Sequence, residues 1–577
     1  MVILHPRRGA HRRHQIIEIM RGVDGKDTRH LGRRGRVHTR DQGVCVIAAP
    51  ERDMQHAWNH AVGREHALAG QQPPVLDPLD ACADILWPQP EADIGAGEPG
   101  RSIQTVSHGG RSFFGVSRRL SSSPMNTCRP IRLNAFDMAC VGHIQHGMWT
   151  HPRDHSADYT SLDHWVRLAQ MLERGLFDGL FLADVLGAYD VYGGNADASL
   201  RGAVQIPLLD PTALVPAMAH ATTHLGFGVT CNLAYEPPFL FARRMATLDH
   251  LTGGRIGWNI VTGYLDSAAR AMGFDAQVEH DDRYDLAEEY LQVVYALWEG
   301  GWADDAVLRD RRRGIYTDPR RVRPLRHHGE QFDVEAIPLW EPSPQRTPVL
   351  YQAGASDRGR VFAARHAECV FVNASTKQNV RRIVTDLRAR AAPRPMLVFV
   401  GASVVTGRTE RDAHELLAEY RRYASAEGAL AHAAASLGID FDRYGMDEPI
   451  EAGPTQAIRS NVEAITASLG PGWSKRGLID RFVLGSRQPP IVGSPGEVAD
   501  QLIDWVNEAD VDGFNLSRTV VPECLESFIE LVLPVLQERG AYKREYALGT
   551  YRQKLFGCGD RLPDQHPAAA ARWNAVQ

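Results

Sequence analysis

The sequence lacks long apolar runs and paired cysteines. No uninterrupted apolar segment approaches the roughly 18 residues that a membrane-spanning helix needs. The most apolar stretches, such as residues 396–405, have the length of a strand. The eight cysteines are scattered and form no CxxC pair, which is typical of thiols in a reducing compartment rather than of a disulfide framework. We therefore expect a cytoplasmic protein without a membrane span.

Several catalytic motifs are absent as well. There is no GxSxG nucleophile elbow, no phosphate-binding P-loop, and no GxGxxG turn that opens a helix after a strand. A redox reaction would therefore use a pyridine nucleotide bound elsewhere. His143, His146, His151 and His155 lie close together in the sequence, but no HExxH pattern or suitably spaced carboxylate or thiolate completes a metal site. We predict no metal.

Charge and composition narrow the class of protein. The 577 residues carry a formal net charge of -6, with 44% hydrophobic and 23% charged residues, as in ordinary globular proteins. A general nucleic-acid binder would need a basic surface to displace counterions, so nucleic acid is not an expected partner. The length suits one large barrel with insertions, or two or three average domains.

Residues 1–124 differ in character from the rest. Arg/His-rich stretches such as 7–14 and Pro/Gly-rich runs such as 95–100 show little sustained helical or strand period. The compact apolar core of a cleavable signal is missing. We expect a disordered or spurious extension, with translation starting at Met125, followed by one barrel domain over residues 125–577.

From residue 132 onward, short apolar segments alternate with amphipathic helices, for example at 162–174 and 284–299. This order predicts parallel βα units. Two segments, 301–347 and 407–490, are too long for minimal loops and are predicted to be insertions. Eight strands would close a (β/α)8 TIM barrel, and we place them at residues 132–138, 178–184, 225–232, 256–262, 348–354, 369–373, 396–405 and 512–517.

Catalytic groups in a TIM barrel stand at the carboxyl ends of the strands. The fifth predicted strand runs into small residues and then Ser356, where a helix should begin. A helix N-terminus offers free N–H groups and partial positive charge to a phosphate, and Arg358 would add a charge-assisted contact. The alternative is that Ser356 only caps the helix. His280 and Tyr284 share one helix face, which is also common in purely structural pairs.

Six segments, in order, resemble the nitrilotriacetate and dibenzothiophene-sulfone monooxygenase branch of the bacterial-luciferase-like, FMN-dependent monooxygenases. The matching segments are LNAFDM (133–138), FLAD (181–184) with YDVYGG (189–194), GWNIVT (257–262), HDDRYDLAEEY (280–290), QAGAS (352–356) and DGFNL (512–516). They cover nearly the whole predicted barrel. The extension before Met125 has no counterpart in the family.

The resemblance implies the oxygenase component of a two-component flavin monooxygenase. Such an enzyme uses reduced FMN and O2, through a peroxide at flavin carbon 4a, to oxygenate a small organic substrate. Its usual partners are a separate NAD(P)H:flavin reductase and further copies of itself in a homo-oligomer. The alternatives are a deazaflavin-dependent oxidoreductase on the same barrel and a non-catalytic flavin-binding protein.

The resemblance also assigns roles to individual residues. It implies a catalytic role for His143 beside the flavin adduct or the substrate. It places FMN contacts at Asp184, Thr230, His280, Tyr284 and Ser356. Substrate-pocket residues are expected at Phe136, Asn259 and Val261. The sequence does not identify the substrate.

Overall fold

The computed structural model describes residues 129–577 except 355, 373–375, 451–464, 466–468, 471, 485–488 and 577. The chain divides into two units, and the described residues all belong to the second, Arg119–Gln577. The predicted extension over residues 1–124 lies outside the described residues. No helix in the described part of the chain is both long and apolar enough to cross a membrane.

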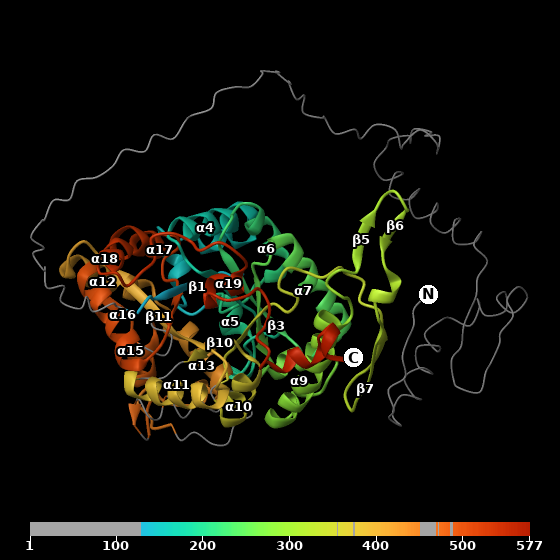
Figure 1. Cartoon of the computed structure of the whole chain (residues 1–577). Helices are drawn as coiled ribbons and strands as arrows, with labels where there is room; N and C mark the ends of the chain where they lie inside the picture. Colours follow the sequence, from blue (N-terminus) through green and yellow to red (C-terminus); the bar gives the residue numbers. More distant parts are fainter. Residues whose placement is uncertain are drawn as a thin grey trace, which may run out of the picture. The chain divides into compact units, whose positions relative to one another are not determined.

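The second unit contains a closed barrel of parallel strands, as the sequence predicted (Figure 1). Around the barrel the strands follow the order β1, β2, β3, β4, β9, β10, β11, β13, and β13 pairs with β1 to close it. Their bounds are β1 Arg132–Met138, β2 Gly179–Ala183, β3 Gly226–Asn232, β4 Ile256–Val261, β9 Val349–Gln352, β10 Cys369–Val372, β11 Leu397–Thr406 and β13 Gly513–Ser517. Each strand lies within about two residues of its predicted bounds, because short buried strands read clearly between polar turns.

Helices surround this barrel (Figure 1). The predicted helix over 162–174 is α4, and it buries Trp165, Leu168 and Leu172 against the strands. The helix predicted over 284–299 begins four residues earlier, as α9 His280–Tyr295, because the acidic residues of its first turn suit the helix N-terminus. The other helices next to barrel strands are α6 Pro211–His220, α7 Pro238–Thr252, α10 Asp357–His366, α11 Lys377–Ala391, α16 Pro495–Ala509, α17 Glu523–Ser527 and α18 Leu533–Glu538.

Aromatic side chains close the barrel from below. Tyr551, at the start of α19 Tyr551–Phe556, fills the amino end, and its hydroxyl lies 2.5 Å from that of Tyr351. A Cβ atom on Gly226 would lie 2.3 Å from the Tyr551 ring. Above it, Phe136 packs against Phe181 and Phe371 with ring centroids 5.6 and 5.4 Å apart. These aromatic rings therefore fill the amino end and the centre of the barrel interior.

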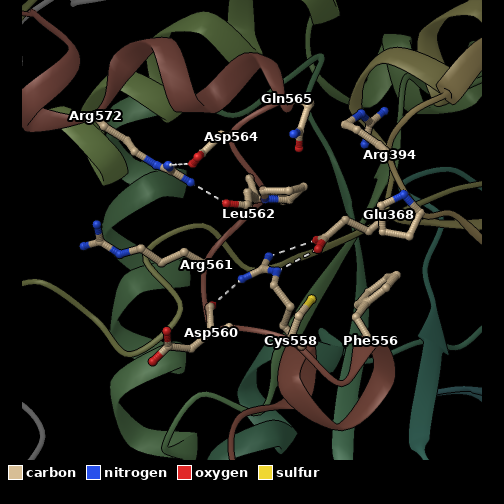
Figure 2. Close-up of a pocket in the computed structure, with 14 residues that line it drawn as sticks. Glu368, Arg394, Phe556, Cys558, Asp560, Arg561, Leu562, Asp564, Gln565 and Arg572 are labelled. Atoms are coloured by element: carbon tan, nitrogen blue, oxygen red, sulfur yellow. Dashed lines mark hydrogen bonds and ion pairs between the residues drawn. The ribbon is translucent and has the colours of Figure 1, made fainter.

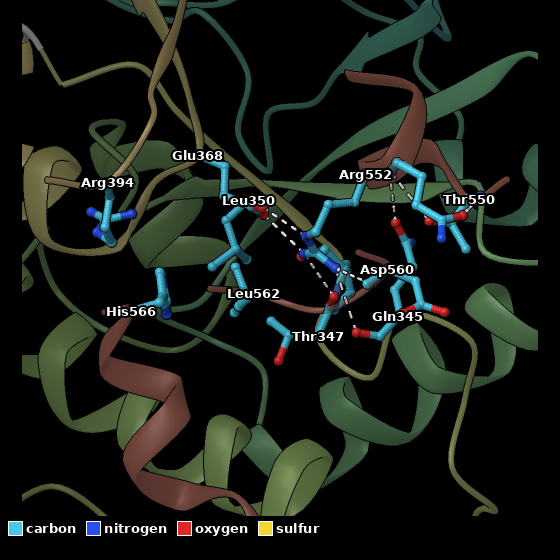
Figure 3. A network of polar contacts seen from close by, with 12 residues as sticks. Gln345, Thr347, Leu350, Glu368, Arg394, Thr550, Arg552, Asp560, Leu562 and His566 are labelled. Atoms are coloured by element: carbon cyan, nitrogen blue, oxygen red, sulfur yellow. Dashed lines mark hydrogen bonds and ion pairs between the residues drawn. The ribbon is translucent and has the colours of Figure 1, made fainter. Parts of the chain in front are cut away.

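The amino end is also held by a buried ion pair (Figure 3). Arg552 donates to both carboxylate oxygens of Glu368 at 2.7 and 2.9 Å, and to the carbonyls of Thr347, Pro348 and Asp560. Every polar group of this network has a partner, which is what allows a charge to be buried. The network ties α19 to the starts of β9 and β10.

Two segments stand outside the regular βα order. Residues 301–347 form two hairpins, β5 Val307–Asp310 with β6 Ile315–Thr317 and β7 Leu325–His328 with β8 Asp333–Ala336. Figure 1 shows β5 and β6 extending away from the helices. The stretch after β11 contains α12 Glu410–Tyr423, α13 Ala426–Leu437 and α15 Lys475–Phe482, and then β12 Ile491–Gly493, which pairs with the end of β11. Two further α-helices in the described part of the chain are α5 Asp197–Gly202 and α8 Asp266–Ala271.

Candidate functional site

The N-termini of α9 and α10 meet beside the carboxyl end of β9. Ser356 caps α10, since its Oγ accepts a hydrogen bond from the Gly359 N–H at 3.1 Å. The same oxygen lies 3.4 Å from His280 Nε2, and Tyr284 makes side-chain hydrogen bonds to Ser356 and Gln352. The His280 and Tyr284 rings are 5.4 Å apart. The two residues that share a face of α9 therefore converge with Ser356, in a corner where a helix N-terminus favours an anion.

The backbone in this corner is tightly packed. A Cβ on Gly359 would lie 2.8 Å from the Tyr284 hydroxyl, and one on Gly354 would lie 2.5 Å from the Gln352 amide. Arg358, predicted as an additional phosphate contact, instead donates to Asp285 at 2.8 Å, with its guanidinium 5.6 Å from the centre of the Tyr284 ring. Arg358 therefore forms an ion pair with the Asp285 carboxylate. The cap itself is present, so Ser356 has the structural role that was the alternative to phosphate binding.

Asp184 and Thr230 line one cavity of about 330 Å³ at the carboxyl ends of β2 and β3. Burial, together with the nearby Asp210 carboxylate, raises the pKa of Asp184 to about 7. A carboxyl group with that pKa is protonated about half the time at neutral pH, and it can then donate a hydrogen bond as well as accept one. Arg244 and Glu236, also on this cavity, form an ion pair of 2.5 Å.

Asn259 links this cavity to the next strand. Its Nδ2 donates to Thr230 Oγ1 at 2.9 Å, while its buried Oδ1 has no hydrogen-bond partner among the described residues. Alternate residues of a barrel strand face inward, so Val261 faces the same way as Asn259. An unpartnered buried carbonyl oxygen costs free energy unless a ligand or water satisfies it.

His143 stands at the mouth above the aromatic floor. Its ring centroid lies 4.6 Å from that of Phe136, and its buried Nδ1 has no hydrogen-bond partner within the described part of the chain. Burial lowers the pKa of His143 well below its usual value, and the nearby charges of Arg518 and His432 lower it further. The imidazole is therefore neutral at neutral pH and can exchange a hydrogen bond with a ligand.

The other three histidines of the cluster have different surroundings. His146 Nε2 lies 2.8 Å from His432 Nδ1, and α13 supplies His432. His151 packs against the Tyr423 ring at 4.6 Å, and His155 is exposed beside Asp158. His143 is the one of the four that the sequence analysis assigned to the site; His146 and His151 are buried as well, at 1% and 2% exposure.

Tertiary contacts add residues that the sequence analysis missed. Gln205 Nε2 donates to the His143 carbonyl at 2.7 Å, and the Tyr189 hydroxyl donates to Gln205 Oε1 at 2.7 Å. Tyr264 extends this chain, because its hydroxyl lies 2.6 Å from that of Tyr189. One available signal was the YDVYGG segment, which contains Tyr189.

The predicted FMN contacts lie along one arc of the rim. Thr230 pairs with Asn259 across β3 and β4, and Ile260 pairs with Gln352 across β4 and β9. With strands about 4.8 Å apart, the three spacings from β2 to β9 span about 14 Å. This arc runs from the Asp184 cavity to the Ser356 corner, and it suits an elongated ligand with an anionic end.

A second cavity, of about 510 Å³, lies at the opposite end of the barrel (Figure 2). The C-terminal tail and the residues that precede β10 and β11 line it, and the Arg552–Glu368 pair is among these residues. Figure 2 shows the Arg572–Asp564 pair on its wall. None of the predicted site residues lines this cavity. In TIM barrels the amino end serves stability and the carboxyl end chemistry, so the smaller cavity is the relevant one.

The fold and rim define the class: a (β/α)8-barrel enzyme with its functional groups at the carboxyl ends of the strands. The luciferase-like monooxygenase family matches residues 143–512. The chain is 48% identical over 450 residues to the long-chain alkane monooxygenase of Geobacillus thermodenitrificans (strain NG80-2), covering 77% of this chain and 98% of that protein. The dimethyl-sulfide monooxygenase of Hyphomicrobium sulfonivorans is 45% identical over 449 residues, covering 77% and 94%.

A crystal structure of a long-chain alkane monooxygenase aligns with a TM-score of 0.72 and 47% identity, covering 77% of this chain and all of that one. This chain belongs to the luciferase-like monooxygenase family. It is the oxygenase component of a two-component monooxygenase that uses reduced FMN and O2, and such a component implies a flavin reductase partner. The branch named from the sequence is also found, since the dibenzothiophene-sulfone monooxygenase of Rhodococcus erythropolis is 36% identical.

The rim residues fit FMN. The N-terminus of α10 offers a seat for the phosphate, and the unpartnered Oδ1 of Asn259 can accept a hydrogen bond from a ring N–H. Asp184 and Thr230 add polar groups at the other end of the arc. Reduced FMN, when bound, supplies the electrons that activate O2.

Proposed function

We propose that this enzyme oxygenates a small apolar compound in the barrel mouth, with FMN held by Asp184, Thr230, His280, Tyr284 and Ser356. The observation that carries this proposal is the convergence of His280, Tyr284 and Ser356 at the N-terminus of α10. This corner lies on the same arc of strands as the unpartnered Asn259 oxygen. An anion seat and a polar lining on one arc match the two ends of FMN.

The residues of the mouth have separate tasks in this proposal. Ser356 and the α10 N-terminus bind the phosphate. With this end of FMN held, the length of the cofactor determines where its ring lies. Phe136 and its aromatic neighbours exclude water from below. His143 is neutral and buried, and its Nδ1, which has no partner among the described residues, is left to form one hydrogen bond with a ligand beside the reacting groups.

An apolar substrate follows from the floor of the site. Phe136, Phe181 and Phe371 form a continuous aromatic surface below His143. Such a surface favours alkyl or alkyl-sulfur groups over polycarboxylates, because it has no cation to pair with a carboxylate. Two relatives with more than 40% identity are named for long-chain alkanes and for dimethyl sulfide.

The test couples the purified protein to an NAD(P)H:flavin reductase and presents n-alkanes, dialkyl sulfides and nitrilotriacetate in parallel. We expect products heavier by one oxygen atom from an apolar substrate, together with FMN dependence. His143→Phe is the matched variant that keeps a planar ring without a hydrogen-bonding nitrogen, and it should lose product while still binding FMN. Turnover of nitrilotriacetate alone would contradict the apolar assignment.

We further propose that the protein works in the cytoplasm as a homo-oligomer, with the β5–β6 hairpin as a contact surface. Leu308 and Tyr316 on this hairpin are 42% and 59% exposed. An isolated two-stranded hairpin is marginally stable in water, so apolar side chains on it favour a protein partner. We expect the double variant Leu308→Ser/Tyr316→Ser to dissociate in light-scattering measurements. Leu251→Ser, an equally exposed leucine at the end of α7, should not; a monomeric native protein would contradict this proposal.

A further inference from the structure

A buried arginine lies behind the loop that carries His143. Arg518 follows β13 directly and is 5% exposed. Its Nε lies 2.7 Å from an Asp137 carboxylate oxygen, and Asp137, on β1, is 2% exposed. Burying two charges costs free energy unless the geometry of the pair is good. Neither residue belongs to the flavin contacts assigned above.

The same guanidinium also holds the loop backbone. Arg518 Nη2 donates to the carbonyls of Cys140 and Val141 at 2.7 and 3.0 Å. These are the residues immediately before the turn at Gly142 and His143. Gln205 holds the loop from the other side, through the His143 carbonyl. The planar fork of an arginine can make these contacts at once, whereas a lysine offers one point charge.

The charged groups around His143 are mostly cationic or become so on protonation. Arg518 faces it from the end of β13, His432 from α13 and His146 from its own loop. The Asp137 carboxylate, which lies next to Arg518, is already paired with it. Protonation of His143 would therefore place a second buried cation beside Arg518 without a free counter-ion.

We propose that Arg518 is a positioning residue for the monooxygenation: it fixes the loop that aims His143 into the barrel mouth, and it brings a buried positive charge close to that imidazole. The proposal rests on the role of His143 in the proposed function. Burial and the Arg518 charge both lower the pKa of His143, which agrees with this arrangement. The ion pair with Asp137 anchors the guanidinium so that it points at the loop.

The first experiment needs no cofactor. The imidazole signals of the FMN-free protein are followed by NMR against pH, and His143→Asn assigns the His143 signal. We expect no protonation of His143 in the native protein near pH 5. In Arg518→Gln we expect its midpoint to rise by about one pH unit or more, as loss of a neighbouring like charge predicts, whereas Arg518→Lys should keep it low.

The matched control is Arg394→Gln. Arg394 is also a buried arginine, and it precedes β11 at the amino end of the barrel. It donates to the carbonyls of Ala364 and Ala367. This change should leave the His143 titration unaltered. An unaltered His143 titration in Arg518→Gln would overturn the electrostatic part of the proposal.

The second experiment measures how much of the FMNH2 consumed yields product rather than hydrogen peroxide. Arg518→Lys keeps the charge but not the fork, so we expect uncoupling with near-native FMNH2 affinity, because the phosphate corner is on other strands. Arg518→Gln should also move the acid limb of the activity profile to higher pH. Native coupling in Arg518→Lys would overturn the positioning role. If no substrate is oxygenated at all, the proposed function fails while the NMR result still decides the charge effect.

Discussion

Replacing Ser356 with aspartate separates the two roles that the structure allows at this position. Aspartate is as good an N-cap as serine, and its charge suits the helix N-terminus, so α10 should remain intact. The same carboxylate would stand where the FMN phosphate is proposed to bind. Alanine has the opposite effects: it destabilises the helix by removing the cap, and it adds no charge that would repel the phosphate.

The magnitudes of these effects differ enough to measure. Two unit charges 4 Å apart repel by about 1 kcal/mol even at the dielectric constant of water, so a phosphate dianion is repelled by about 2 kcal/mol. The lost hydrogen bond to a charged group adds about 1.5–3 kcal/mol. Ser356→Asp should therefore weaken FMN binding by about 300-fold or more. Ser356→Ala should weaken it by about 10- to 150-fold and lower the free energy of unfolding by about 1 kcal/mol.

Both quantities are accessible in solution. Anaerobic titration gives the affinity for FMNH2, and urea unfolding of the FMN-free protein gives the stability. Thr376→Asp is the matched control, because Thr376 caps α11 after the neighbouring strand β10, and its Oγ1 accepts from the Asn379 N–H at 3.2 Å. It should bind FMNH2 like the native protein. Native affinity in Ser356→Asp would refute the phosphate seat.

Three further predictions concern stability. Arg552→Ala leaves the Glu368 carboxylate buried without its counter-ion, so we expect a loss of about 3–5 kcal/mol in urea unfolding, and an unchanged midpoint would contradict the role given to this pair. Burial lowers the pKa of His566 to about 3, so the unfolded chain takes up a proton below about pH 6.5 that this residue in the native chain refuses. His566 alone should therefore lower the stability by about 1.4 kcal/mol for each pH unit of acidification there, and His566→Gln should make the slope shallower by that amount. Gly226→Ala forces a Cβ to within 2.3 Å of the Tyr551 ring, so the melting temperature should drop, and it should recover in combination with Tyr551→Leu.

The strands and the helix α4 were predictable because their signals are local. Apolar runs of strand length mark β1, β3 and β4 within one or two residues, and the pattern of α4 gave its bounds. The bounds of α9 were harder, since its first turn is polar and its apolar stripe begins only at Tyr284. The irregular segments, residues 301–347 and 407–490, were placed as insertions but not resolved into hairpins and helices. The strands of the two hairpins in 301–347 are short and half-exposed, so periodicity says little about them.

Some residues of the candidate site were likewise predictable from local sequence, and others were not. Ser356 was found because small residues followed by a predicted helix N-terminus indicate a phosphate site from neighbouring residues alone. Arg358 was expected to face the same ligand, but a neighbouring carboxylate on α9 pairs with it instead. His143 was singled out from the four clustered histidines, but the burial of His146 and His151 could not be predicted from residue type or spacing.

The sequence by itself determined the barrel, the positions of its strand ends and the family, because alternation, helix caps and ordered segments are written into neighbouring residues. Only the tertiary structure decided which side chains act together. Arg518 and Cys140 are 378 residues apart in the chain, and their hydrogen bond exists because β13 closes the barrel onto β1. Contacts of this kind depend on how buried surfaces pack, and packing is a property of the folded chain as a whole.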